Sequence, residues 1–353
     1  MIFLIVRKIT AAPITYHPIG PIFGAIFPSS KLIASEMSAN AQRLAIEIGW
    51  LSSTIYFEPR TLTSTAMSTP TVTTRTRQIL FPTDFSATSQ HAFEYALDMA
   101  AHIGARVLMF HSYFEAPTSK GVAPPAFLDK LRSEKEDNAM RGFRRYESEA
   151  QARTGGEVEL VPLIESGRTV EQILAVSRQE QVDMIVMGTK GAASVSEKIF
   201  GSLTTRVIEG ADCPVLAVPE GVSFQPIQHI LYASNFEDHD FAILDQLLEY
   251  ADLFGAKLSC AHIYAGEDYW SRLDRGFFER LYQLERERDQ LHFFTFNYRD
   301  VAAGLNRFIA SNKVDLLAMM THKRDPLRQV LGESVTRDMT LMAEVPLLAF
   351  HCP

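Results

Sequence analysis

The sequence predicts an α/β protein built from two tandem, doubly wound parallel sheets of five strands each. Two observations carry this prediction. Short apolar runs alternate with amphipathic stretches of helical period, which is the pattern of buried strands joined by helical crossovers. The chain also repeats itself, because QILFPTDFS at residues 78–86 returns as HILYASNFE at residues 229–237. Right-handed crossovers within each copy then give a Rossmann-like arrangement.

The repeat extends beyond the opening strand. The helix after it keeps its apolar positions at helical spacing in both copies. The matching strand segments are IGARVLMFHSYF (103–114) with FGAKLSCAHIYA (254–265), VDMIVM (182–187) with VDLLAM (314–319), and CPVLAVP (213–219) with VPLLAF (345–350). Strands of the first copy are expected near residues 78–82, 105–111, 157–164, 182–187 and 214–218. Two long charged helices, 127–153 and 268–290, are expected to be solvated outer faces.

The repeat divides the chain into three segments. Residues 76–220 and 226–353 are expected to form the two domains, with a short linker between them, so the copies should pack against each other. Residues 1–75 have no counterpart in the repeat and no helical or strand period. They are either a poorly ordered extension or an over-extended start with Met67 as the natural first residue, and we favour the second interpretation.

Composition narrows the class of protein. The chain is 46% hydrophobic and 22% charged, and its net charge of −8 does not suit nucleic acid binding. It holds no apolar run of the length that a membrane span requires, and its first apolar run precedes the basic pair Arg7-Lys8, unlike a signal peptide. The three cysteines lie far apart without metal-ligand spacing, so neither disulfides nor a metal site is expected, and the cytoplasm is the expected location.

A glycine-rich segment between a strand and a helix is the strongest sign of a binding site. Gly188 and Gly191 follow the apolar strand 182–187, and Gly201-Ser202 opens a helix expected over residues 202–209. Glycines let a ligand approach the backbone, and the start of a helix offers free N–H groups, a hydroxyl and the positive end of a dipole. This is the chemistry of a phosphate site, so the segment predicts that the protein holds a nucleotide.

Asp84, at the end of the first strand, is the second candidate. In a doubly wound sheet, ligands bind outside the carboxyl ends of the strands where the winding reverses. If the first and fourth strands are neighbours there, Asp84 and Gly188 face the same crevice. The Asp84 carboxylate could accept a ribose hydroxyl, or it could cap the helix that begins near residues 86–89. Both roles are compatible.

The pattern Gly-x2-Gly-x9-Gly-Ser at residues 188–202 resembles the nucleotide motif of the universal stress protein family, and the PTDFS, IGARVLMFHSY and CPVLAVP segments resemble that family as well. The resemblance covers residues 78–220 well and 228–353 more weakly. It implies an adenine-nucleotide-hydrolase-like fold in which the first domain binds ATP, with or without Mg²⁺. The residues that it implies are Thr83 and Asp84 at the adenosine, Ser112 at the base, Met187 at the base or ribose, and Gly188, Gly191, Gly201, Ser202, Leu203 and Thr204 around the phosphates.

The same resemblance implies a stress-response role through nucleotide-dependent binding or signalling. It also implies that the closing strands of the two copies pair as an intramolecular pseudo-dimer, which leaves a homodimer of the whole chain open. The residues show no catalytic triad, metal cluster or paired carboxylates, so we expect no enzyme, although slow ATP hydrolysis stays open. The alternatives are a nucleotide-free interaction scaffold and a nucleotide-hydrolysing enzyme of the same fold.

The second copy departs from the motif and is expected to keep the fold without the nucleotide site. Asn235 replaces Asp84, Met320 replaces Gly188, and Glu333 follows the surviving Gly332 where the first copy has Ser202. A carboxylate at a helix start satisfies the dipole and would repel phosphate. The basic residues near His322 are expected to be a solvated loop. His111 and His262, at equivalent strand ends, are expected to be hydrogen-bonded structural residues.

Overall fold

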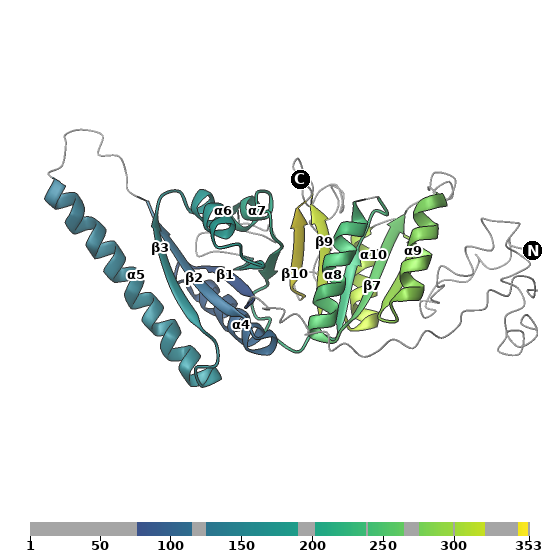
Figure 1. Ribbon diagram of the computed structural model, residues 1–353, viewed down its shortest axis with the longest axis horizontal. Coiled ribbons are helices and arrows are strands. Elements are labelled where there is room, and N and C mark those ends of the chain that lie inside the picture. Colours follow the sequence, from purple (N-terminus) through teal and green to yellow (C-terminus); the bar gives the residue numbers. More distant parts are fainter. Residues whose placement is uncertain are drawn as a thin grey trace, which may run out of the picture. The chain divides into compact units, whose positions relative to one another are not determined.

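The computed structural model describes residues 76–114, 125–189, 202–237, 239–264, 275–298, 301–321 and 345–351 (Figure 1). Contacts gather residues 76–353 into one compact unit. Strands and helices alternate along it as the apolar pattern predicted. None of the described helices combines the length and the apolar character that crossing a membrane requires.

Seven helices and ten strands are assigned in the described residues, and Figure 1 labels most of them. Those of the first half are β1 (Gln78–Pro82), α4 (Ala87–Ile103), β2 (Arg106–Tyr113), α5 (Pro125–Thr154), β3 (Leu160–Ser166), α6 (Thr169–Gln179), β4 (Met184–Gly188), α7 (Ser202–Ile208) and β5 (Val215–Val218). Those of the second half are β6 (His229–Ala233), α8 (Asp240–Phe254), β7 (Lys257–Tyr264), α9 (Arg275–Glu287), β8 (Leu291–Asn297), α10 (Val301–Asn312), β9 (Leu316–Thr321) and β10 (Leu347–His351).

The ten strands form one continuous sheet in the order β3-β2-β1-β4-β5-β10-β9-β6-β7-β8. All pairs within each half are parallel, and the central pair of β5 with β10 is antiparallel. The α/β class with its parallel strands is therefore confirmed, and the β5–β10 pair joins the five strands of each half into one sheet. The physical reason is that all four residues of β5 are buried, and pairing with β10 satisfies backbone groups that an edge strand would leave open.

The winding direction reverses at the same point in each half. β1 lies beside β4 with Leu80 opposite Ile185, and β6 lies beside β9 with Leu231 opposite Leu317. From these strands the chain winds outward in both directions, so β1/β4 and β6/β9 are the switch points of the two halves. We call the carboxyl ends of each of these neighbouring strands the β1/β4 edge and the β6/β9 edge. The expectation that the first and fourth strands are neighbours is confirmed.

An aspartate fixes the fourth strand of each half against the first. Asp183 Oδ2 accepts the backbone N–H of Gln78 at 2.7 Å. In the second half, Asp315 Oδ2 accepts the N–H groups of Gln228 and His229, both at 2.9 Å. These carboxylates occupy equivalent places in the repeated VDMIVM and VDLLAM segments, so the repeat preserves the bonds that align the switch-point strands.

The halves also touch through helices α4 and α8 and the linker between β5 and β6. The Tyr250 hydroxyl of α8 donates to the Asp183 carbonyl oxygen at 3.1 Å. In the linker, the Phe224 ring packs edge-on against Tyr95 of α4 at 5.3 Å between centroids. The Nε2 atom of His91 lies 2.9 Å from the Val222 carbonyl oxygen, to which it donates. The linker therefore contributes packing as well as connection.

Candidate functional site

The turn after β1 is held firmly by hydrogen bonds to β2 and within itself. The Thr83 backbone N–H donates to the Phe110 carbonyl at 2.8 Å, and His111 Nδ1 donates to the Thr83 carbonyl at 2.8 Å. The Thr83 hydroxyl oxygen accepts the Phe85 N–H at 2.9 Å and shares a 2.9 Å hydrogen bond with the Tyr146 hydroxyl. Thr83 is buried, and its polar groups hold the turn at the end of β1.

Asp84 is exposed at the tip of this turn, and one of its oxygens is already oriented. Oδ1 accepts the Ser86 N–H at 3.0 Å and the Ser89 hydroxyl at 2.5 Å. Partial burial raises the pKa of the Asp84 carboxyl, but the hydrogen bonds from Ser86 and Ser89 outweigh it and leave that pKa below its ordinary value. The helix cap is Ser86, whose hydroxyl accepts the Ser89 N–H at 3.2 Å. The ionised Asp84 carboxylate therefore fixes the residues that lead into the capped start of α4.

Gly188 ends β4 beside this turn. Its carbonyl oxygen accepts the hydroxyl of Thr204, a buried residue of α7, at 2.9 Å. A Cβ atom at Gly188 would lie 3.1 Å from Cγ2 and 3.4 Å from the carbonyl oxygen of Thr88 on α4. A side chain at this position would require Thr88 to shift by a few tenths of an ångström, so glycine suits the close packing of β4 on α4. Ser202 and Leu203 begin α7 and are exposed.

The remaining predicted residues divide into three groups. The Ser112 hydroxyl, at the carboxyl end of β2, donates to Thr169 Oγ1 at 2.9 Å. Met187 lies in the core of the first half, packed in one cluster with residues such as Ile173. Gly191 and Gly201 lie outside the described residues. The structure thus brings Thr83, Asp84 and Gly188 to the β1/β4 edge and turns the Met187 side chain into the core.

Sequence reasoning missed the contribution of α5, which was expected to be a solvated helix. Its Tyr146 binds Thr83, and burial raises the pKa of Tyr146 to about 12. A Cβ atom at Gly142 would overlap the Phe85 ring, so this glycine makes room for the turn. The buried residues of α5 are Ala139, Gly142, Phe143, Tyr146 and Ala150. Their helical spacing within the charged segment was the signal that could have revealed this buried side.

The second half repeats the turn but uses its carboxylate differently. Phe236 N–H donates to Ser234 Oγ at 2.9 Å, and His262 Nδ1 donates to the Ser234 carbonyl at 2.8 Å. In the place of Ser89 stands Asp240, which is 1% exposed and accepts the hydroxyls of Tyr232 and, at 2.6 Å, of Ser234. This half keeps the Asp240 carboxylate inside the protein and has the neutral Asn235 at the tip of the turn, with the exposed Glu237 two residues further on.

Both histidines at equivalent strand ends have the structural role expected of them. Each donates to the carbonyl of the preceding turn, and each packs on the phenylalanine of that turn, at 4.9 Å between the rings of His111 and Phe85 and at 5.0 Å for His262 and Phe236. Burial lowers the pKa of His262 below its ordinary value, outweighing the Ser234 carbonyl and the Asp240 charge, which raise it. No group of three or more metal-ligating side chains occurs among the described residues.

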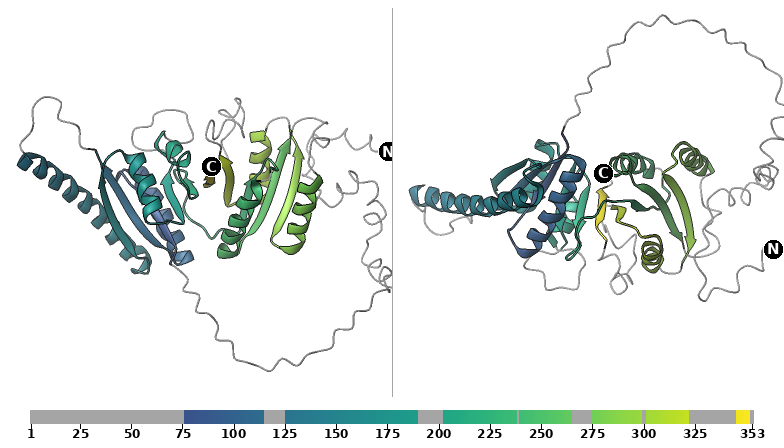
Figure 2. Two further views of the ribbon diagram at one scale, coloured as in Figure 1. Left: turned by 45° about the horizontal axis from the view of Figure 1, so that its top comes forward. Right: turned by 90° about the horizontal axis from the view of Figure 1, so that it is seen from below.

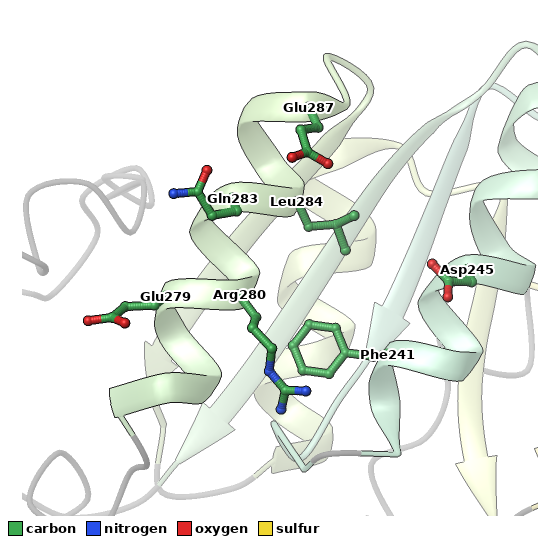
Figure 3. A pocket seen from close by; sticks show the side chains of 7 residues that line it. All are labelled: Phe241, Asp245, Glu279, Arg280, Gln283, Leu284 and Glu287. Carbon is green, nitrogen blue, oxygen red and sulfur yellow. The ribbon is translucent and has the colours of Figure 1, made fainter.

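A cavity of about 440 Å³ lies elsewhere, between α8 and α9. Figure 3 shows Arg280 reaching across to the ring of Phe241, and its guanidinium carbon is 4.3 Å from the ring centroid. The other lining residues are Asp245, Glu279, Gln283, Leu284 and Glu287. This cavity belongs to the second half and is separate from the β1/β4 edge.

The comparisons with known proteins agree with this architecture. The model of the "Universal stress protein family" matches residues 75–219 and again 226–351. A Thermus aquaticus protein named "Universal stress protein in QAH/OAS sulfhydrylase 3'region" is 34% identical over 142 residues, which are 40% of this chain and 98% of that protein. The chain therefore belongs to the universal stress protein family, as a tandem member with two copies of the domain.

Two solved structures extend the comparison. A universal stress protein from Archaeoglobus fulgidus has a TM-score of 0.56 at 18% identity, covering 78% of this chain and 96% of that one, which shows a shared fold. A universal stress protein in complex with cAMP is 22% identical over 40% of this chain and 96% of its own, with a TM-score of 0.32. That protein binds a cyclic nucleotide.

Proposed function

We propose that the first half of this protein binds an adenine nucleotide, ATP, at the β1/β4 edge, and acts in the stress response through nucleotide-dependent binding or signalling. One observation carries the proposal. At the switch point, where doubly wound sheets bind ligands, the exposed Asp84 carboxylate is kept ionised and oriented by Ser86 and Ser89. Its hydrogen bonds described here all use Oδ1, so Oδ2 is the atom proposed to accept a ribose hydroxyl.

The other predicted residues take their proposed roles from this position. Ser112, two strands away from β4, would border the base, and Met187 would support the site from the core behind it. Gly191, Gly201 and Ser202 would surround the phosphates, with Mg²⁺ as an optional counterion. Thr83 and Thr204 would shape the site from beneath, since Thr204 binds the Gly188 carbonyl.

We propose that the second half does not bind nucleotide. Asp240 is buried among Tyr232 and Ser234, and Asn235 offers no charge at the tip of the turn. Its role would be to cover β5 through β10 as an intramolecular pseudo-dimer. The proposed location is the cytoplasm, where the free thiols of Cys213 and Cys260 would stay reduced.

The test is calorimetric titration of ATP into the wild type and into Asp84→Asn. The amide oxygen of asparagine can still accept the Ser86 N–H, so the turn is preserved while the charge is lost. We expect one site per chain and an affinity at least about tenfold weaker in the variant, about 1.4 kcal/mol. The matched control, Asn235→Ala at the equivalent place of the second half, should leave the affinity unchanged. Absence of binding to the wild type, or equal affinity in both Asp84 forms, contradicts the proposal.

A nucleotide-free interaction scaffold is the second candidate, favoured by the exposed Phe127 and Leu128 at the start of α5. Denaturing the protein purified from cells and separating the released small molecules distinguishes the two, because only a binding protein should release adenine nucleotide. We propose binding without rapid turnover. Steady phosphate release that disappears in Ser202→Ala would instead indicate an enzyme.

A further inference from the structure

The first turns of α5 carry an apolar surface that is exposed to solvent. Phe127, Leu128 and Leu131 are 52%, 41% and 39% exposed, and Phe114 at the end of β2 is 56% exposed. Four of the five large hydrophobic side chains exposed among the described residues are therefore found at this place, the fifth being Leu203. The i, i+1, i+4 spacing puts the three residues of α5 on one side of the helix.

This part of α5 extends past the end of the sheet. The helix is level with the end of β2 at Lys135, whose Nζ donates to the Phe114 carbonyl at 2.7 Å, and at Glu136, which accepts the Tyr113 hydroxyl at 3.0 Å. Residues 125–134 continue beyond that point for about 15 Å. Figures 1 and 2 show these turns lying away from the other labelled helices and strands. We call residues 125–134 the α5 overhang.

The fold itself does not require the overhang. In the second half the corresponding helix α9 has 13 residues, whereas α5 has 30. Residues 126–134 are all exposed, and a helical stretch of this length is marginal in water without packing. Leu128 and Leu131 nevertheless continue the apolar side that is buried further along at Phe143 and Tyr146. An apolar stripe maintained beyond the sheet indicates a surface that is covered by another molecule.

We propose that the α5 overhang is the contact surface between two copies of this chain. The local charge of the overhang, compared with that of the whole chain, favours this occupant. The whole chain carries a net charge of −8, which opposes self-association through most of its surface. The charged residues of the overhang are Asp129, Lys130, Arg132 and Glu134, two of each sign, so two copies can meet here without net repulsion. A two-fold contact of this kind uses the same surface on both partners.

The exposed area is consistent with a dimer. The two phenylalanines together expose roughly 200 Å², given about 150–250 Å² for each aromatic side chain, and Leu128 and Leu131 add to this area. An interface of standard size buries about 800 Å² on each partner. The apolar side chains therefore supply the centre of such an interface, and the aliphatic stems of the neighbouring lysine and arginine supply its rim.

The test is sedimentation equilibrium of the full chain over a wide range of concentrations. We expect a concentration-dependent dimer for the wild type. Leu131→Glu should raise the dimer dissociation constant by about tenfold or more, since it places a charge at the centre of the interface. Ser133→Glu, an exposed position on the opposite side of the same helix, is the matched control and should change it by less than about threefold. Circular dichroism checks that both variants fold.

Two results would overturn the proposal. One is a dimer whose dissociation constant Leu131→Glu does not change, because the copies would then meet elsewhere. The other is a wild type that stays monomeric at every concentration. If the overhang amides of that monomer are protected from hydrogen exchange, another segment of the same chain or a different partner covers the surface.

Discussion

Phe85 holds a backbone conformation that residues with bulky side chains rarely adopt, with a φ of 59°. The second half repeats it at Phe236, with a φ of 60°. Such strain persists where the surroundings fix it, and here each ring packs on the histidine of the neighbouring strand. The bend places the preceding residue, Asp84 or Asn235, at the exposed tip. The two halves therefore share one turn and differ in the charge of the residue at its tip.

The ionisation of Asp84 should make a measurable contribution to stability. Its pKa is lower in the folded protein than the ordinary value of 3.8. The contribution is therefore present above the unfolded pKa and is lost as pH falls through the lower folded pKa. We expect Asp84→Asn to be less stable than the wild type at neutral pH, with a difference that begins to shrink as the pH falls below about 4 and vanishes only below the lower folded pKa.

Urea unfolding at a series of pH values measures this difference. Asp245→Asn, at an exposed position of α8, is the control for the loss of a single surface carboxylate. A constant difference between Asp84→Asn and the wild type across the whole range would mean that Ser86 and Ser89 do not favour the ionised form.

Among the elements, α5 links the turn after β1 to the rest of the first half. Tyr146 shares a hydrogen bond with Thr83, and Gly142 leaves room for the Phe85 ring. The ring of Phe85 also lies 5.3 Å from that of Phe143. A displacement of α5 should therefore also move Asp84, because Phe85 packs on α5 and follows Asp84 in the chain.

Gly142→Leu tests this link. The new side chain must displace the Phe85 ring, and such overpacking costs about 1–3 kcal/mol of the free energy of unfolding. We expect weaker ATP binding as well, because the Asp84 turn moves with Phe85. Glu147→Leu, exposed on the same helix, should change stability by only about 0.5 kcal/mol. Chemical unfolding and calorimetry measure the two effects, and normal ATP affinity in Gly142→Leu would rule out the link.

For the whole molecule, the repeated aspartates do more than align strands within each half. Burial, followed by the charge of Asp183, raises the pKa of Tyr250 in the second half. Burial, followed by the charge of Asp315, raises the pKa of Tyr95 in the first. Each half thus places a tyrosine near the aspartate of the other. Together with the β5–β10 pair, these contacts couple the folding of the two halves.

We expect the described halves to unfold in one transition, and Phe224→Ala to weaken their coupling. Phe224 contacts both Tyr95 and His102 of α4, so its removal should lower the melting temperature by several degrees. Gln225→Ala, an exposed neighbour in the linker, is the control and should have little effect. Calorimetry would contradict this view if the wild type already showed two separate transitions.

Much of the fold could be predicted from the sequence. The strand expected near 182–187 is observed at Met184–Gly188, and the one expected at 78–82 has those bounds. The helix expected over 202–209 is Ser202–Ile208. Apolar runs and helical periods are local signals, so they survive in a single chain. For the candidate site, the neighbouring positions of Asp84 and Gly188 followed from strand order.

The direction and bonding of single side chains could not be predicted in the same way. The resemblance implied that Thr83 lies at the adenosine and Met187 at the base or ribose, and the structure adds that both side chains are buried and that the Thr83 hydroxyl is bonded to Tyr146. That partner is 63 residues away in the sequence. The buried Asp240 was not anticipated either, because its partners Tyr232 and Ser234 matter only once α8 folds back on β6.

The sequence by itself determined the elements, their repetition and the difference between the two copies at Asp84 and Asn235, because each of these depends on residues close together in the chain. Only the tertiary structure decided the antiparallel direction and the register of the β5–β10 pair, and the support that α5 gives the turn through Gly142 and Tyr146. Backbone pairing between strands and ring packing between helices depend on distances that form when remote segments meet, and no local pattern of residues encodes those distances.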